Sequence, residues 1–397
     1  MRFPRFGVLA ATALVAACGS KDNGTTEPVT PTTGMSTTAR AYLTEALDFE
    51  QDVFYWGDKI NWTTMRADVM SKAANAQKPS DTYNAIQYSI DHYFRPLGDF
   101  HSGFWPPSEA PGRTDSPPNN PLYLVQGQML GKVAYLYVPT FAGLNPKGRA
   151  DTTLAMIKAL DANKPCGWII DLRTNPGGTW AAMFAGLNPL VGDGQFAGLV
   201  DNTNAKAYFY VQNGEAGIYD PSTRKNYPQV TASSTYTLNH PNPPVALLQG
   251  PWTASAGEII LLAFKGYPNA TRSFGTNSSG DTTVPAGEYL PPDSAYLNIT
   301  AAIMFDRTGK LYGNAITPDQ VIPSDTTYNR SPGARDLSTT AALNWLATRP
   351  ECGGTGSTQD LPALRANPDA FPQSTGPRTR PLNVSPYFLT NRAATTF

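Results

Sequence analysis

Apolar residues recur at helical spacing in three successive segments between residues 36 and 94. Each segment opens with short polar side chains of the kind that cap helices, including Asn61 and either Ser80 or Asp81. The pattern breaks at the Pro/Gly-rich stretch "RPLGDFHSGFWPPSEAPG" that follows. The sequence therefore predicts a small N-terminal helical bundle over residues 36–95.

Beyond residue 96, short continuous apolar runs alternate with helical patterns. "GWIIDL" and "PVALLQG" are apolar enough to be strands buried on both faces, and each leads through a turn into an apolar helix. Strands that alternate with helices favour α/β layering with right-handed crossovers. We therefore expect an α/β core over residues 96–350, with a β-rich cap insertion at 195–240 and a loosely ordered tail at 351–397.

The N-terminus has the pattern of an export signal. Two early arginines precede an apolar run from Val8 to Ala17, which is shorter than the roughly 20 residues that span a bilayer. "LVAAC" resembles a bacterial lipobox, so we expect residues 1–18 to be a lipoprotein signal peptide and Cys18 to be lipidated. Residues 19–35 contain almost no large apolar side chains and predict a flexible tether. The protein is therefore expected to be exported and lipid-anchored to the cell envelope, on the periplasmic side of the outer membrane if the source is Gram-negative.

Charge and cysteine content narrow the range of partners. Lys plus Arg number 30 and Asp plus Glu number 31, for a formal net charge of −1, which gives no reason to expect nucleic acid as a partner. Besides Cys18 the chain has only Cys166 and Cys352, and the sequence leaves open whether they pair. Neither has His or Cys neighbours at metal-ligand spacing, so no metal and no other cofactor is expected.

The candidate chemistry begins with Ser255 in "GPWTASAGEIILLAF", between a predicted strand and an apolar helix. Serine is among the commonest helix caps, and a cap is the alternative to a nucleophile here. "IIDLRTNPGG" places Gly177 and Gly178 at the same point of a second strand–helix unit. Such loops gather at the carboxyl ends of strands, where main-chain N–H groups, including that of Ala256, suit an anionic tetrahedral intermediate. These segments predict a nucleophile beside an oxyanion hole.

A serine nucleophile needs a base, and the chain has three histidines. His92 falls within a predicted helix and His240 precedes "PNPP", whereas His101 lies in the polar, Gly-bounded stretch "LGDFHSGFW". Lys265 is about 15 Å from Ser255 along the predicted helix and cannot reach it. His101 is therefore the candidate base, with Asp99 as a candidate to orient its imidazole.

The motifs "GKVAYLYVPTF", "GWIIDLRTNPGG", "TASAGEII" and "NAITPDQVI", in that order, resemble the C-terminal processing peptidases, or tail-specific proteases. The resemblance covers about residues 36–350 and extends to the tricorn-core and nisin-resistance proteins. It implies a Clp-protease/crotonase-like α/β core and cleavage near the C-terminus of peptides or proteins. It assigns the nucleophile to Ser255 and the oxyanion donors to Ala256 and a glycine of "NPGG".

The chain departs from the family pattern at the base. Family members with a Ser–Lys dyad carry the lysine in a "G-K-G" turn, where this chain has "SFGTNSSGD" with Asn277. "GDFHS" looks like the His-bearing element of the tricorn-like branch, which gives the base role to His101. The glutamate of that branch is absent, with Tyr312 near its expected place, and the span from His101 to Gly131 is too short for a PDZ domain. We therefore expect a Ser–His dyad without a PDZ domain.

Together these observations predict a membrane-tethered serine peptidase acting on peptide or protein substrates. A non-catalytic peptide- or ligand-binding protein on the same fold is the alternative, and export to a compartment poor in CoA disfavours an acyl-CoA enzyme. Asp171 and Arg173 are expected to pair and hold their turn, and Glu258 to favour the helix dipole.

Overall fold

The computed structural model describes residues 34–110, 124–141, 143, 145–267, 270–322 and 336–353. The predicted signal peptide with Cys18, nearly all of the predicted tether and nearly all of the predicted tail lie outside these ranges. Within them, no helix has both the length and the apolar character needed to cross a bilayer.

The secondary structure follows the alternation of the apolar pattern. The α-helices are α1 (Thr37–Val53), α2 (Trp62–Lys72), α3 (Tyr83–Ser89), α4 (Pro146–Asp161), α5 (Trp180–Val191), α6 (Ala256–Phe264) and α7 (Leu337–Ala347). The strands are β1 (Gly103–Trp105), β2 (Gln126–Leu130), β3 (Val133–Tyr137), β4 (Gly167–Asp171), β5 (Gly194–Asp201), β6 (Lys206–Gln212), β7 (Glu215–Asp220), β8 (Lys225–Thr231), β9 (Val245–Gln249), β10 (Thr271–Gly275), β11 (Thr283–Leu290), β12 (Ala295–Phe305) and β13 (Gln320–Val321).

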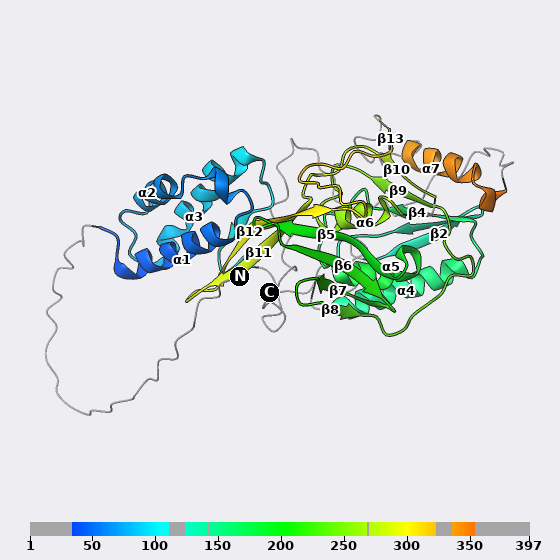
Figure 1. The fold of residues 1–397 in the computed structure, drawn as a ribbon, viewed down its shortest axis with the longest axis horizontal. Coiled ribbons are helices and arrows are strands. Elements are labelled where there is room, and N and C mark those ends of the chain that lie inside the picture. The colour runs from blue at the N-terminus through cyan, green and yellow to red at the C-terminus, as the bar shows by residue number, and fades with distance from the viewer. Residues whose placement is uncertain are drawn as a thin grey trace, which may run out of the picture.

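A six-stranded sheet of order β13-β10-β9-β4-β3-β2 forms the centre of the core. All neighbours in it are parallel except β2, which pairs antiparallel with β3 at the edge. Every residue of β3, β4 and β9 is buried, because helices cover both faces. Helix α7 packs on one face and α4, α5 and α6 on the other, as Figure 1 shows for α7, α4 and α5.

A seven-stranded sheet of order β1-β12-β5-β6-β7-β8, with β11 also paired to β12, lies beside this core. The residues predicted as a cap form β5 to β8, which extend this sheet and pack their aromatic side chains, such as Phe196 and Phe209, against α5. The strands β11 and β12 reach out of the core to the N-terminal helices (Figure 1). Leu290, Leu297 and Ile299 of this pair are buried with the apolar faces of α1 to α3.

The helix starts show which local expectations hold. Asn61 caps α2 as predicted, since its side chain accepts a hydrogen bond from the N–H of Thr64 at 3.1 Å. The predicted cap at Ser80 or Asp81 is wrong, because a 3₁₀ turn already begins at Pro79 and both residues lie inside it. The Asp81 carboxylate instead accepts from the N–H groups of Gln77 and Lys78, which precede the turn. Proline favours the first position of a helical turn, and the start moves upstream accordingly.

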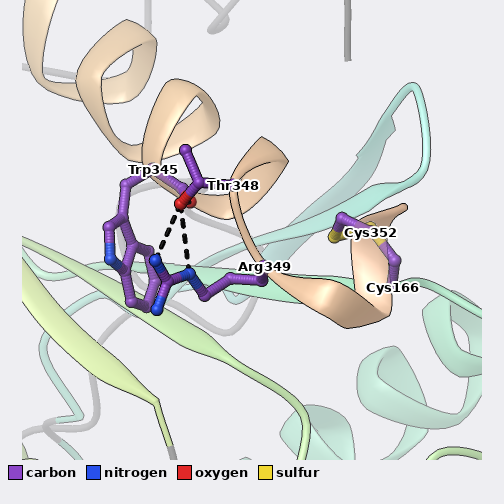
Figure 2. The surroundings of a disulfide bond; sticks show 5 residues. All are labelled: Cys166, Trp345, Thr348, Arg349 and Cys352. Carbon is purple, nitrogen blue, oxygen red and sulfur yellow. Dashed lines mark hydrogen bonds between the residues drawn. A yellow bond between two sulfur atoms is a disulfide. The ribbon is translucent and has the colours of Figure 1, made fainter. Parts of the chain in front are cut away.

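Helix α7 is linked to the chain at both ends of β4, by a disulfide at one end and an ion pair at the other. Cys166, just before β4, forms a disulfide with Cys352, in the 3₁₀ turn that follows α7, with the two Cα atoms 4.9 Å apart. Figure 2 shows this bond at the turn that follows α7. Arg349, between α7 and that turn, places its guanidinium 5.1 Å from the Trp345 ring. Cys166 and Cys352 therefore pair with each other, which the sequence had left open.

At the other end of β4, Arg173 binds two carboxylates. It contacts Asp171 at 2.6 Å and Asp336, the N-cap of α7, at 2.9 Å, and its guanidinium is buried. Arg173 and Asp171 thus hold the turn after β4, as expected from the sequence, and they also tie α7 to it.

Candidate active site

Ser255 lies at the carboxyl end of β9, where the chain turns into α6. Its backbone has φ 50° and ψ −116°, a left-handed region that residues with a side chain rarely occupy. Such strain persists only where the surroundings enforce it, and it clusters at active sites. The turn presents the Ser255 side chain at the helix N-terminus while the residue stays 3 % exposed.

The Ser255 hydroxyl has no hydrogen-bond partner among the described residues, although it is buried. A helix cap would accept a hydrogen bond from an N–H of the first turn. The side chain that does bond here is that of Glu258, whose carboxylate accepts from the N–H of Ser255 at 2.9 Å. Ser255 therefore stands at the cap position with its hydroxyl unused, which removes the strongest alternative to a nucleophile.

Glu258 does more than the favourable dipole interaction expected from the sequence. It is fully buried, and besides Ser255 it accepts from the Ser278 hydroxyl at 2.6 Å and the Gly280 N–H at 2.9 Å. Burial, together with the charge of Asp281, raises the pKa of Glu258 to about 8, while these hydrogen bonds act in the opposite direction. Glu258 joins the nucleophile turn to the loop between β10 and β11.

The turn after β4 lies against the nucleophile. A Cβ added to Gly177 would lie 2.9 Å from the Cβ of Ser255, and one added to Gly178 would lie 2.3 Å from the Phe141 carbonyl oxygen. Both glycines have positive φ, 107° and 114°. Only glycine fits this approach, because it has no Cβ and tolerates that conformation.

The oxyanion expectation needs one correction. The Gly177 N–H donates to Asn175 Oδ1 at 2.8 Å, so in this structure Gly177 is not an available donor. The N–H groups of Gly178 and Ala256 have no hydrogen-bond partner within the described part of the chain. These two groups are the ones free to bind an oxyanion.

His101 is held at its main chain and at its ring. Its N–H donates to Asp99 Oδ1 at 3.0 Å, its carbonyl accepts from the Asn298 side chain at 3.1 Å, and Nδ1 lies 2.9 Å from Thr283 Oγ1. Asp99 therefore differs from its expected role: its Oδ1 accepts from the backbone N–H groups of His101 and Ser102 and from the Thr300 hydroxyl. It orders the loop and makes no hydrogen bond to the imidazole.

The loop between β10 and β11 connects the two candidate catalytic residues. The Ser279 N–H donates to the carbonyl of Thr253, two residues before Ser255, at 2.8 Å. Thr283, which bonds His101, is four residues further on and hence at most about 14 Å along an extended chain. This loop therefore contacts the strand-to-helix turn of Ser255 near its start and the ring of His101 at its end. Ser255 and His101 are not hydrogen-bonded to each other in this structure, and such bonds often tighten only with substrate.

The other candidate groups lie elsewhere. His92 is exposed and stacked on Tyr88, with ring centroids 3.8 Å apart, and His240 is exposed in the connection before β9. Lys265, past the end of α6, pairs with Asp319 at 2.7 Å. Across the described ranges, no cluster of three His, Cys, Asp or Glu side chains is placed to hold a metal ion.

The sequence alone assigned no role to two residues of this site, Asn175 and Thr283. It assigned Glu258 only a favourable interaction with the helix dipole. Asn175 occupies the Gly177 N–H and donates to the carbonyls of Val138 and Pro139, each at 3.1 Å. Thr283 bonds a histidine 182 positions away, and Glu258 organises the nucleophile turn. A pattern of apolar spacing carries no signal for the Thr283 contact, whereas the position of Glu258 three residues after a candidate cap matches the capping-box spacing.

The chain is similar to a known protein family and to a known protein. Residues 132–322 match the model of Peptidase family S41. The nisin-resistance protein of Lactococcus lactis subsp. lactis is 28 % identical over 279 residues, which cover 70 % of this chain and 81 % of that protein.

Solved structures show the same fold. A lipoprotein from Streptococcus agalactiae superposes with a TM-score of 0.61 at 24 % identity, over 79 % of this chain and 98 % of that one. The photosystem II D1 C-terminal processing protease gives a TM-score of 0.50 at 15 % identity, over 72 % and 94 %. The predicted α/β class with a Clp-protease/crotonase-like core is confirmed. The resemblance drawn from the motifs is confirmed as well: residues 132–322 form a Peptidase S41 family domain.

Proposed function

We propose that this S41 domain is a serine peptidase in which Ser255 is the nucleophile and His101 the general base. The observation that carries the proposal is the buried Ser255 hydroxyl, which has no partner in the described chain and sits on a turn with positive φ at a helix N-terminus. The N–H groups of Gly178 and Ala256, which have no partner in the described ranges, supply the oxyanion hole.

The chemistry follows from these groups. His101 Nε2 takes the hydroxyl proton as Ser255 Oγ attacks the peptide carbonyl carbon, and the resulting oxyanion binds the two main-chain N–H groups. Collapse of the tetrahedral intermediate expels the amine, which receives the proton from the imidazolium. Water, deprotonated by the same imidazole, then hydrolyses the acyl-enzyme and frees the serine.

We also propose that the protein works in the cell envelope, tethered through a lipid on Cys18, and cleaves peptides or proteins near their C-termini. Cys18 lies outside the described residues, so this rests on the signal-like sequence and on relatives that include a nisin-resistance protein and a lipoprotein. The Cys166–Cys352 disulfide is of the kind that persists in oxidising compartments outside the cytosol. C-terminal cleavage rests on the family resemblance.

The test is covalent labelling of the purified protein with a fluorophosphonate, read by intact mass and peptide mapping, together with cleavage of a peptide library. One label per chain on Ser255, and loss of both labelling and cleavage in Ser255→Ala, are expected. His101→Ala is expected to lower the cleavage rate by several orders of magnitude, because the two groups act as a unit. Cleavage by Ser255→Ala at the wild-type rate would contradict the proposal. Binding of peptides without labelling or cleavage would instead support a non-catalytic binding protein.

A further inference from the structure

We propose that the hydroxyl of Thr283 orients the imidazole of His101, taking the place that a carboxylate holds in Ser–His–Asp hydrolases. This inference rests on the proposed function and names a positioning residue for it. Its observation is the 2.9 Å separation between His101 Nδ1 and Thr283 Oγ1, two groups 182 residues apart in the chain.

Both partners are buried and rigidly placed. His101 is 9 % exposed and Thr283 4 % exposed. Thr283 is the first residue of β11, where it pairs with Ile303 of β12. The preceding residue, Thr282, is fixed from both sides: its carbonyl accepts from the Met304 N–H at 3.0 Å and its hydroxyl donates to the Asn314 carbonyl at 2.9 Å.

The histidine backbone is fixed independently of its ring. Asp99 and Asn298 bond its N–H and carbonyl, and neither touches the imidazole. Among the described residues, the Thr283 hydroxyl is therefore the group that hydrogen-bonds the ring and sets its orientation. Without it, the imidazole would be free to turn about its side-chain torsions while the loop stayed in place.

The base role, rather than the contact, sets the tautomer, since a threonine hydroxyl can accept from Nδ1–H or donate to Nδ1. A general base needs an unprotonated nitrogen facing the serine, so the proton must sit on the other ring nitrogen. If Nδ1–H donates to Thr283 Oγ1, the lone pair on Nε2 is left for the Ser255 proton. Asp99 supplies no carboxylate partner to the ring: its Oδ1 accepts from backbone N–H groups and the Thr300 hydroxyl, and its Oδ2 has no hydrogen-bond partner among the described residues. A neutral hydroxyl holds the ring but adds no full charge to stabilise an imidazolium.

The experiment compares Thr283→Val, which keeps the shape and removes the hydroxyl, with Thr283→Ser, which keeps the hydroxyl. The first readout is the second-order rate of Ser255 labelling by a fluorophosphonate, which needs no knowledge of the natural substrate. We expect Thr283→Val to label about 10- to 100-fold more slowly, the effect of one lost hydrogen bond in a buried site, and Thr283→Ser to stay within about 3-fold of wild type. Thr282→Val is the matched control, since it loses a buried threonine bond in the same segment without touching His101.

The second readout is the tautomer itself, from ¹⁵N spectra of histidine-labelled protein. The chain has three histidines, and the two exposed ones serve as internal references. We expect the neutral His101 ring to carry its proton on Nδ1 in wild type and Thr283→Ser, and to lose that preference in Thr283→Val. Melting temperatures verify that each variant is folded.

The outcomes separate this inference from the proposed function. Equal labelling rates in folded Thr283→Val and wild type, or a wild-type ring protonated on Nε2, would overturn the inference while leaving the serine peptidase intact. Equal losses in Thr283→Val and Thr283→Ser would overturn it too, because packing rather than the hydroxyl would then matter. If wild type is not labelled at all, the proposed function fails, and the tautomer of His101 still decides the role of Thr283.

Discussion

Glu258 accepts a hydrogen bond from the main-chain N–H of Ser255 at 2.9 Å, which ties a buried carboxylate to the strained turn of the candidate nucleophile. The other Glu258 oxygen binds the Ser278 hydroxyl and the Gly280 N–H, in the loop that leads to Thr283. The carboxylate thus fastens the nucleophile side of the site to the base side. Its three partners are all donors, an arrangement that an amide cannot satisfy equally.

Glu258→Gln is therefore expected to disturb the site more than the small change in shape suggests. Above about pH 8, where Glu258 is ionised, the new NH₂ group replaces an acceptor oxygen and must face at least one of the three N–H or O–H donors. At such a pH we expect Ser255 labelling to slow about 10- to 100-fold. The measurement is the fluorophosphonate labelling rate, with melting temperature alongside. Glu351→Gln, in the exposed turn after α7, is the matched control and should label like wild type. Unchanged labelling in Glu258→Gln would show that the Ser255 turn holds its shape without this contact.

Stability should fall as the pH rises toward 8. Burial raises the pKa of both Glu50 and Glu258 to about 8. An acid whose pKa is higher in the folded than in the unfolded state contributes stability at low pH, and that contribution is lost as the pH rises through the folded value. We expect the melting temperature to decrease between about pH 5 and about pH 8.

Glu50→Gln tests the part of this effect that lies in the helical bundle. Glu50 is fully buried, accepts from the Ser89 hydroxyl at 2.7 Å, and has a second oxygen without a partner in the described residues. The neutral amide has no charge to bury, so the decrease in melting temperature with pH should be smaller in this variant. An identical pH dependence in the two proteins would contradict the prediction.

Gly178→Ala should be severely destabilising. The new Cβ would lie 2.3 Å from the Phe141 carbonyl oxygen at a residue with φ 114°, so the turn beside Ser255 must move. We expect a loss of at least about 2 kcal/mol in the free energy of unfolding and loss of Ser255 labelling. Gly131→Ala separates the steric clash from the cost of a positive φ, because Gly131 has φ 61° but open space around its Cβ position. We therefore expect Gly131→Ala to lower the unfolding free energy by only about 1 kcal/mol and to leave Ser255 labelling intact. Equal unfolding free energies for the two variants, measured in urea, would refute the steric argument.

Removal of the disulfide should loosen α7. Replacing Cys166 and Cys352 with serine opens a cross-link over 186 residues, and we expect the unfolding free energy to drop by about 2–5 kcal/mol. Urea denaturation with and without dithiothreitol measures this: the reductant should destabilise wild type and leave the double variant unchanged. The Arg173–Asp336 ion pair still holds the other end of α7. The prediction would be contradicted if the unfolding free energy of wild type were the same with and without dithiothreitol, even when the reductant is added to the denatured protein.

The sequence predicted those parts of the molecule that depend on local spacing. Strands β4 and β9 were evident as continuous apolar runs, and α5 and α6 as apolar helices that follow them. Residues at the carboxyl ends of neighbouring parallel strands must meet at one edge of the sheet, so the approach of Gly177 to Ser255 was foreseeable. What was not foreseeable is that Asn175 occupies the Gly177 N–H, because that depends on the backbone path of one turn.

The apolar pattern, the turn glycines and the family motifs by themselves determined the α/β core, the candidate nucleophile and the candidate base, since each is written in a few adjacent residues. The tertiary structure decided the contacts that these residues make. The Ser255 hydroxyl has no partner among the described residues, and the Glu258 carboxylate bonds both the Ser255 turn and the loop before β11. Thr283 lies beside the ring of His101. The physical reason is range. Helix and strand periodicity act over a few residues, whereas the histidine's partner comes from a strand 182 positions away. Only the pairing of β1 and β11 with β12 in one sheet brings the two residues within hydrogen-bond distance.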